Sequence, residues 1–253
     1  MLRTIRIILA VFFFVSISLL FLDFTGTVND YLGWTAKLQI LPAILSLNIA
    51  VMIGIAVLTL IAGRFYCSTV CPLGEMQDIV SWLADKQKKN RFAWSKAANG
   101  LRYCLFLMFG GILALGAGSC VYALALLIEP YSAFGRMISQ IMNPAVQWVN
   151  NLLALLANRM GGYVPGPVEL SPFNGTMFAI ALTFLAIIFF MAWRKGRLYC
   201  NSICPVGTLL GLLARFSLFK PRIHDDKCVH CGLCAKNCKS SCIDSEHREI
   251  DYS

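Results

Sequence analysis

Long apolar runs separated by short polar segments dominate the pattern along the chain. A helix needs about 20 apolar residues to cross a bilayer, because it rises ~1.5 Å per residue. We therefore predict four membrane-spanning helices, over residues 7–22, 40–62, 103–127 and 176–193. Residues 137–157 instead alternate apolar and Asn/Gln positions at helical spacing, which predicts an amphipathic helix on the outer membrane surface.

Basic residues at the ends of these runs predict the orientation. They precede the first run, fill the gap between the second and third, and follow the fourth: Arg3, Arg6, Arg64, Lys86, Lys88, Lys89, Arg91, Lys96, Arg102, Arg194, Lys195 and Arg197. The positive-inside rule then places the N-terminus, the 63–102 loop and everything after residue 194 in the cytoplasm. The first run lacks a small-residue cleavage pattern, so we interpret it as an uncleaved signal-anchor helix.

Composition agrees with the membrane class, because 58% of the 253 residues are hydrophobic and only 14% are charged. The net charge of +9 follows from the topology signals and does not indicate a nucleic-acid partner. Eleven cysteines without a secretory cleavage pattern favour metal or redox chemistry over a disulfide scaffold.

A short motif occurs twice, as GRFYCSTVCPLG from Gly63 and as GRLYCNSICPVG from Gly196, at an offset of 133 residues (196 − 63). Each copy carries a C-x3-C-P pair, and the four cysteines are Cys67, Cys71, Cys200 and Cys204. The proline after each pair favours the first turn of a helix, so Cys71 and Cys204 are predicted N-cap residues. A thiolate at a helix N-terminus is stabilised, which predicts a lowered pKa for these thiols.

Both copies continue into a stretch with an apolar face and basic residues, typical of a helix lying along a membrane surface. The unit of membrane helix, C-x3-C-P and surface helix is thus duplicated. Duplicated membrane units often pack with pseudo-symmetry around a shared site, so we expect the four cysteines to converge as the catalytic thiols. Whether they hold a further cluster or stay free redox thiols is left open by the spacing.

A second cysteine group lies in CVHCGLCAKNCKSSC, which starts at Cys228. Its ligand set, with bacterial ferredoxin spacing for a [4Fe–4S] cluster, is Cys228, Cys231, Cys234 and Cys238. Lys239 stands where proline usually follows, and the given chain contains only one such run. Either Cys238 or Cys242 completes the site, or the natural chain continues past Ser253 with a second run and a second cluster. We expect the latter, since EHREIDYS is typical of the spacer between two ferredoxin runs.

These motifs resemble the membrane-bound polyferredoxin family, which includes the quinol dehydrogenase membrane subunit of periplasmic nitrate reductase systems and the membrane part of the nitrous-oxide reduction regulator. LQILP from Leu38 and EPYSAFGR from Glu129 are also similar to family segments near the outer surface. The resemblance implies a multi-pass protein of the bacterial inner membrane, with N-terminus and ferredoxin segment cytoplasmic. It also implies a quinone ligand, a redox partner protein or multi-subunit complex, and a quinol dehydrogenase or other oxidoreductase subunit as the enzyme class.

The expected fold is an all-α integral membrane protein with two parts. Residues 1–222 form a four-helix transmembrane domain with two cytoplasmic C-x3-C-P motifs, and residues 223–253 form a ferredoxin-like segment. The leading hypothesis is electron relay between a quinone pool and a redox partner. Two alternatives stay open: a copper-handling or metalloenzyme assembly factor that uses the C-x3-C-P thiols, and a redox-sensing membrane regulator.

Overall fold

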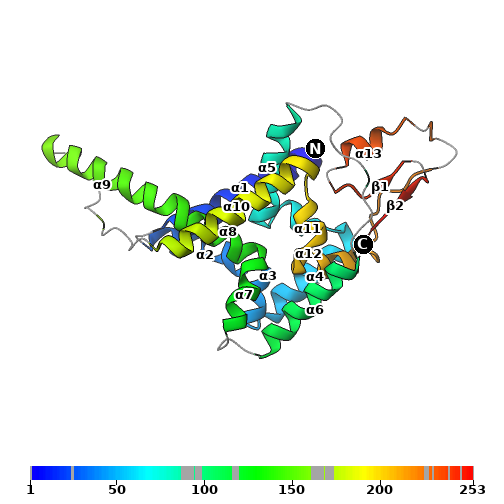
Figure 1. The fold of residues 1–253 in the computed structure, drawn as a ribbon, viewed down its shortest axis with the longest axis horizontal. Coiled ribbons are helices and arrows are strands. Elements are labelled where there is room, and N and C mark those ends of the chain that lie inside the picture. Colours follow the sequence, from blue (N-terminus) through cyan, green and yellow to red (C-terminus); the bar gives the residue numbers. More distant parts are fainter. Residues whose placement is uncertain are drawn as a thin grey trace.

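The structure of the chain is a computed structural model that describes residues 2–23, 26–86, 94, 99–115, 120–160, 168, 174–224, 228–229, 231–238, 240–245 and 247–252. Within these ranges the fold is mostly helical, with one short hairpin near the C-terminus (Figure 1). The expectation of a predominantly helical fold is confirmed.

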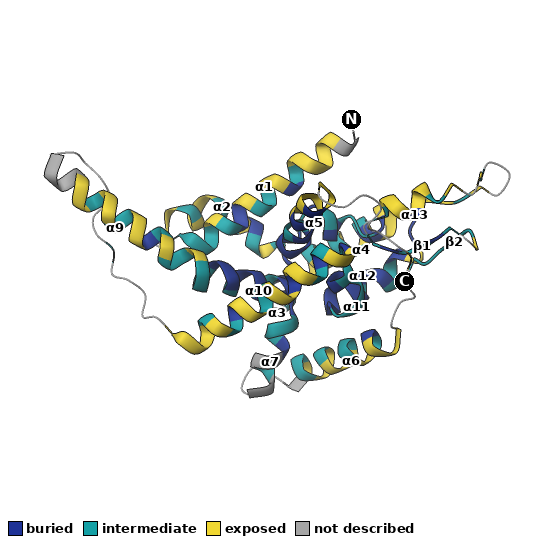
Figure 2. Cartoon of the chain, turned by 45° about the horizontal axis from the view of Figure 1, so that its top comes forward, coloured by how far each residue is buried: buried dark blue, intermediate teal, exposed yellow. Residues whose placement is uncertain are grey.

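Two helices in the described part of the chain are long and apolar enough to cross a membrane. They belong to α1 (Leu2–Leu22) and α10 (Gly175–Lys195), and the apolar segments are Thr4–Leu22 and Gly175–Lys195. Most of their residues face outward rather than into the protein, as Figure 2 shows for α1 and α10. This outward apolar surface suits contact with lipid.

The prediction of a single helix over residues 40–62 is wrong. The structure divides this run into α3 (Ile40–Leu45) and α4 (Ile49–Ala62). Leu47 between them has a positive φ of 51°, and Asn48 caps α4 by accepting a hydrogen bond from the Val51 amide at 3.3 Å. At 14 residues and ~1.5 Å each, α4 is shorter than a bilayer core of about 30 Å.

The third apolar run is described as two helices, α6 (Asn99–Leu115) and α7 (Cys120–Ile128), on either side of residues that lie outside the described ranges. The predicted amphipathic segment is helical, as α8 (Pro130–Met137), a π-helical turn η2 (Ile138–Met142) and α9 (Asn143–Met160). α9 projects from the body of the protein in Figure 1 and exposes apolar side chains such as Trp148 and Leu152. Its position on the outer membrane surface stays a prediction.

The two copies of the repeated unit pack reciprocally. α5 (Pro72–Asp85), which follows the first motif, packs against α10, the helix that leads into the second motif. α12 (Pro205–Ala214), which follows the second motif, packs against α4, the helix that leads into the first. α5 also contacts α1, and α12 contacts α6. This exchange places the two motifs side by side in the most buried part of the protein (Figure 2).

The C-terminal segment folds into α13 (Leu233–Asn237) and an antiparallel pair, β1 (Ile243–Asp244) and β2 (Glu249–Ile250), in which Ile243 is opposite Ile250. β2 lies within the EHREIDYS stretch that was predicted to be a spacer. The chain reaches this segment along the end of α4, where the Leu218 amide donates to the Leu60 carbonyl at 2.8 Å.

Candidate functional site

The structure brings the four cysteines of the repeated motifs together. Two lie in short helical turns, η1 (Tyr66–Ser68) and α11 (Leu198–Ser202), and two are N-cap residues of α5 and α12. Cys67, Cys71, Cys200 and Cys204 are each 3–6% exposed. Charge on one thiol raises the pKa of thiols in the other motif, so the sulfur atoms of both copies share one site.

Glycines give the two motifs their shape. Gly63 and Gly196 end α4 and α10 with the same φ of 67°, a left-handed conformation that favours glycine. A Cβ atom at Gly74 would overlap the carbonyl oxygen of Cys67, and one at Gly207 would overlap that of Cys200. The C-P-x-G spacing therefore lets each new helix begin directly against the preceding cysteine turn.

The prediction of a lowered pKa for the helix-capping thiols of Cys71 and Cys204 is wrong. Burial is the largest effect and raises the pKa of all four thiols, that of Cys200 to about 11. The cap interaction exists, since Cys204 Sγ accepts from the Gly207 amide at 3.3 Å, but it offsets only part of the desolvation. The positive charges of Arg64 and Arg197 also act to lower the pKa of Cys67 and of Cys200.

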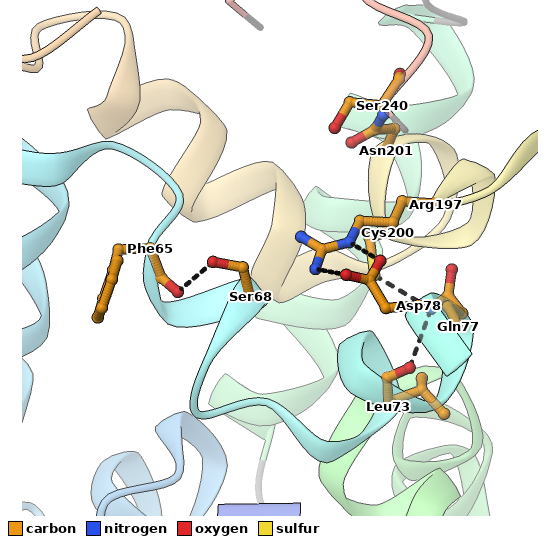
Figure 3. Close-up of polar contacts among 9 residues, drawn as sticks. All are labelled: Phe65, Ser68, Leu73, Gln77, Asp78, Arg197, Cys200, Asn201 and Ser240. Atoms are coloured by element: carbon orange, nitrogen blue, oxygen red, sulfur yellow. Dashed lines mark hydrogen bonds and ion pairs between the residues drawn. The ribbon is translucent and has the colours of Figure 1, made fainter. Parts of the chain in front are cut away.

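Hydrogen-bonding side chains that were not among the predicted site residues surround the cysteines. Gln77 Nε2 donates to Cys200 Sγ at 3.2 Å (Figure 3). Tyr66 Oη donates to Gln39 Oε1 at 2.8 Å, and Gln39 Nε2 donates to the Val70 carbonyl at 3.0 Å. The tyrosine before the first cysteine of each copy was the available signal, because a duplicated aromatic hydroxyl inside an apolar motif needs a buried partner.

These contacts correct the placement of two family-like segments. LQILP and EPYSAFGR were expected near the outer surface, away from the cytoplasmic motifs. Instead Gln39 bonds within the first motif, and Tyr199 of the second motif donates to the Ile128 carbonyl at 2.6 Å, next to buried Glu129. The break between α3 and α4 explains the difference, since a continuous helix would carry residue 40 across the membrane.

An ion pair joins the two copies. Arg197 Nε donates to Asp78 Oδ1 at 2.8 Å, and Arg197 Nη2 donates to Asp78 Oδ2 at 2.9 Å (Figure 3). Both side chains are largely buried, at 12% and 14% exposure. Such a bidentate contact fixes the start of α11 against α5.

The C-terminal cysteine run lies beside this site but is arranged differently. The free thiols of Cys238 and Cys242 are hydrogen-bonded to each other, with 3.4 Å between their sulfur atoms. Cys231 and Cys234 are exposed, and Cys228 is half-buried. A hydrogen bond from the partner thiol and from backbone amides lowers the pKa of Cys238 to about 6, and donating that bond raises the pKa of Cys242. The structure thus gathers two of the run's cysteines.

A chain of hydrogen bonds connects the two cysteine groups. Arg64 Nη1 donates to Asn201 Oδ1 at 2.7 Å, and Asn201 Nδ2 donates to the Ser240 carbonyl at 2.7 Å. Asn201 follows Cys200, and Ser240 lies between Cys238 and Cys242. A cavity of about 210 Å³ adjoins this contact and is lined in part by Arg64, Asn201 and Cys242.

The residues of the repeated motifs fit an iron–sulfur cluster. Four soft sulfur donors meet in a site from which water is excluded, the donor set that [4Fe–4S] clusters use. Cluster binding requires thiolates and would displace the protons of these buried thiols, and nearby Arg64 and Arg197 favour the thiolate form of Cys67 and Cys200. Among the described residues no three His, Cys, Asp or Glu side chains are grouped closely enough to hold a single metal ion, so the fit to a cluster rests on the donor type and on the burial of the four thiols.

Comparison with known proteins shows a similarity to one protein family. A family described as a 4Fe–4S binding domain matches residues 46–90 and 176–224. These two regions are the two copies of the repeated unit, each with its helix and its C-x3-C-P motif. Over both copies of the repeated unit the chain is therefore similar to the polyferredoxin family. The two matched regions indicate [4Fe–4S] clusters as the cofactors of this chain.

Its curated relatives carry related names. The chain is 28% identical over 200 residues to the ferredoxin-type protein NapH of Escherichia coli K12, covering 78% of this chain and 55% of NapH. It is 26% identical to the methylamine utilization ferredoxin-type protein MauN of Paracoccus denitrificans, covering 83% and 58%. It is 23% identical to the putative electron transport protein YccM of E. coli K12, covering 79% and 48%. The chain thus spans about half the length of these relatives, and no solved structure matches it.

Proposed function

We propose that this chain is a multi-pass protein of the bacterial inner membrane that relays electrons between a quinone pool and a redox partner protein. Cys67, Cys71, Cys200 and Cys204 would hold one [4Fe–4S] cluster, and the C-terminal run, with Cys228, Cys231, Cys234 and Cys238, would hold another. A bound cluster supplies one-electron redox chemistry. The hydrogen-bonded contact of Asn201 between the two cysteine groups is the observation that carries the proposal.

An apolar cavity next to the second motif supports a quinone site. It has a volume of about 180 Å³ and lies between α3, α6 and α12, with Pro205 and Val206 in its wall. A neighbouring cavity of about 160 Å³ shares Ile40, Ile44 and Leu209 with it. Paired apolar cavities of this kind suit a ring and its isoprenoid tail.

Glu129 is the polar group of the larger cavity. It is 1% exposed, and its Oε2 accepts a hydrogen bond from the Ser132 amide at 2.6 Å. Burial raises the pKa of this carboxyl, while the Ser132 amide acts in the opposite direction. A carboxyl group with a raised pKa beside the cavity is suited to exchange the proton of a quinol at Oε1 or Oε2.

The surface agrees with a membrane location. Besides α1 and α10, the segment after α12 exposes Phe216, Leu218 and Phe219 at 75–79%, an apolar patch that suits the lipid interface. In the proposed arrangement residues 1–222 lie in and at the membrane. Residues 223–253 form the cytoplasmic segment that meets the partner protein.

The test is anaerobic reduction of the protein by a short-chain quinol in lipid nanodiscs, followed by optical and EPR spectra. We expect reduction in the wild type, a large loss of rate in Glu129→Gln, and no reduction of the first centre in Cys200→Ser. Wild type that contains clusters but exchanges no electrons with quinol or quinone would refute the quinone part. Tight Cu(I) binding lost in Cys67→Ser, with no iron in the wild type, would favour the copper-handling alternative.

A further inference from the structure

The two copies of the repeated unit differ at one charged position. Residue 78 of the first copy corresponds to residue 211 of the second, at the same offset of 133 (211 − 78). Asp78 in the first copy neutralises Arg197 of the second. Arg64 is the counterpart of Arg197 (197 − 64 = 133), but the position it faces is Gly211, which has no carboxylate to offer.

A second arginine occupies the space that the missing side chain leaves. A Cβ atom at Gly211 would overlap the Nη2 atoms of both Arg64 and Arg102, so the two guanidinium groups meet at this glycine. Arg102 comes from the first turn of α6 and is 1% exposed. Two like charges are therefore held together in a buried place, an arrangement that is unfavourable without a counter-ion.

The hydrogen bonds of the pair are incomplete. Arg102 Nε donates to Thr208 Oγ1 at 3.2 Å, and Arg102 Nη2 donates to the Gly207 carbonyl at 3.4 Å. Arg102 Nη1 and Arg64 Nη2 are buried and find no acceptor among the described residues. The two adjoining guanidinium groups thus each keep one buried nitrogen without an acceptor, and these nitrogens form the donor side of an oxyanion site.

The other charges nearby do not complete this site. The charges of Asp251 and Tyr103 raise the pKa of Arg102, while the charge of Arg215 lowers it. Burial and the charge of Arg64 are the larger effects and lower the pKa of Arg102. The cavity of about 210 Å³ that Arg64 lines is also lined by Lys220 and Asp251, so its two cations outnumber its one carboxylate.

We propose that Arg64 and Arg102 bind a phosphate group beside Gly211. Guanidinium groups present forked N–H donors that match the oxygens of a phosphate, and the fixed pair offers one donor from each arginine. The site lies where α6 begins, near exposed apolar Leu101 and Phe216. The same donors suit either free phosphate or the headgroup of an anionic phospholipid.

The test uses the anaerobically purified full chain and two probes. Equilibrium dialysis with labelled orthophosphate, after delipidation in detergent, measures free phosphate binding. Native mass spectrometry of protein from phosphatidylglycerol nanodiscs measures retained lipid. We expect a single phosphate group per chain in at least one experiment, with binding reduced about tenfold or more in Arg102→Gln.

Gly211→Asp separates loss of binding from loss of folding. The new carboxylate restores the symmetric partner of Arg64, so phosphate or lipid binding should disappear while the melting temperature in phosphate-free buffer stays equal or rises. Lys195→Gln removes an exposed cation with the same charge change and should bind as wild type does. Binding to neither probe, an equal loss in Lys195→Gln, or retention of phosphate in Gly211→Asp would overturn the proposal.

Discussion

Asn201 Nδ2 donates a hydrogen bond of 2.7 Å to the main-chain carbonyl of Ser240. The first of these residues follows a cysteine of the repeated motif, and the second lies between the paired thiols Cys238 and Cys242. Asn201 also accepts a hydrogen bond of 2.7 Å from Arg64 of the other motif. One amide side chain thus holds both copies of the motif and the C-terminal cysteine segment in contact.

Replacing Asn201 by alanine should loosen this contact. Each lost hydrogen bond is worth about 1 kcal/mol, so hydrogen exchange at residues 240–242 should become faster. Asn237→Ala is the matched control, because the Asn237 amide donates within α13, to the Leu233 carbonyl. Equal protection of residues 240–242 in wild type and Asn201→Ala would show that the contact does not hold the segment.

Gly207→Ala should destabilise the protein by about 1–3 kcal/mol, because the added methyl group overlaps the Cys200 carbonyl oxygen at the base of the cysteine site. Denaturant unfolding in mild detergent, together with iron content, measures the effect. Gly110→Ala in α6 has no atom within 4 Å of its new methyl group and should be neutral or slightly stabilising. A wild-type iron content and stability for Gly207→Ala would mean that the close approach is not required.

Asp78→Asn should cost about 3 kcal/mol of unfolding free energy, because it leaves the Arg197 guanidinium buried without its carboxylate. Asp85→Asn changes the same charge at the exposed end of the same helix and should stay within about 0.5 kcal/mol of wild type. If both variants unfold at the same denaturant concentration, the ion pair between the two copies has no structural role.

In metal-free protein the thiols should react with iodoacetamide over different pH ranges. The thiolate is the reactive form, so labelling of Cys238 should rise through about pH 6 and level off above it, as its lowered pKa requires. Buried Cys200, with a pKa raised to about 11, should stay unlabelled at neutral pH. Mass spectrometry of the labelled peptides reports both. Labelling of Cys200 at pH 7 as fast as that of Cys238 would contradict this ordering.

The sequence was sufficient for what depends on spacing and duplication. C-x3-C-P predicted the helix starts at Cys71 and Cys204, and the doubled unit predicted that the two pairs meet. What it missed depends largely on tertiary contacts. Leu47 breaks the apolar run at a point with neither glycine nor proline, where the local signal is the pair of polar residues Ser46 and Asn48, the second of which caps α4.

The direction of the thiol pKa was a different kind of error. The helix N-terminus lowers a thiol pKa and can be predicted from the local sequence. The larger and opposite effect is the desolvation that the four converging motif segments impose. Burial of this degree is a property of the packed protein. The ion pair of Arg197 with Asp78 was hidden for the same reason, since 119 positions separate its partners (197 − 78).

The central claim is that the repeated motifs hold their own cluster. Iron and acid-labile sulfide per chain, with EPR of the reduced state, should be compared in wild type, Cys67→Ser/Cys200→Ser and Cys231→Ser, all purified without oxygen. We predict that Cys67→Ser/Cys200→Ser loses about four iron atoms per chain, one [4Fe–4S] cluster, and that Cys231→Ser loses iron from a separate centre. Iron lost only in Cys231→Ser would contradict the account and leave the C-x3-C-P cysteines as free thiols.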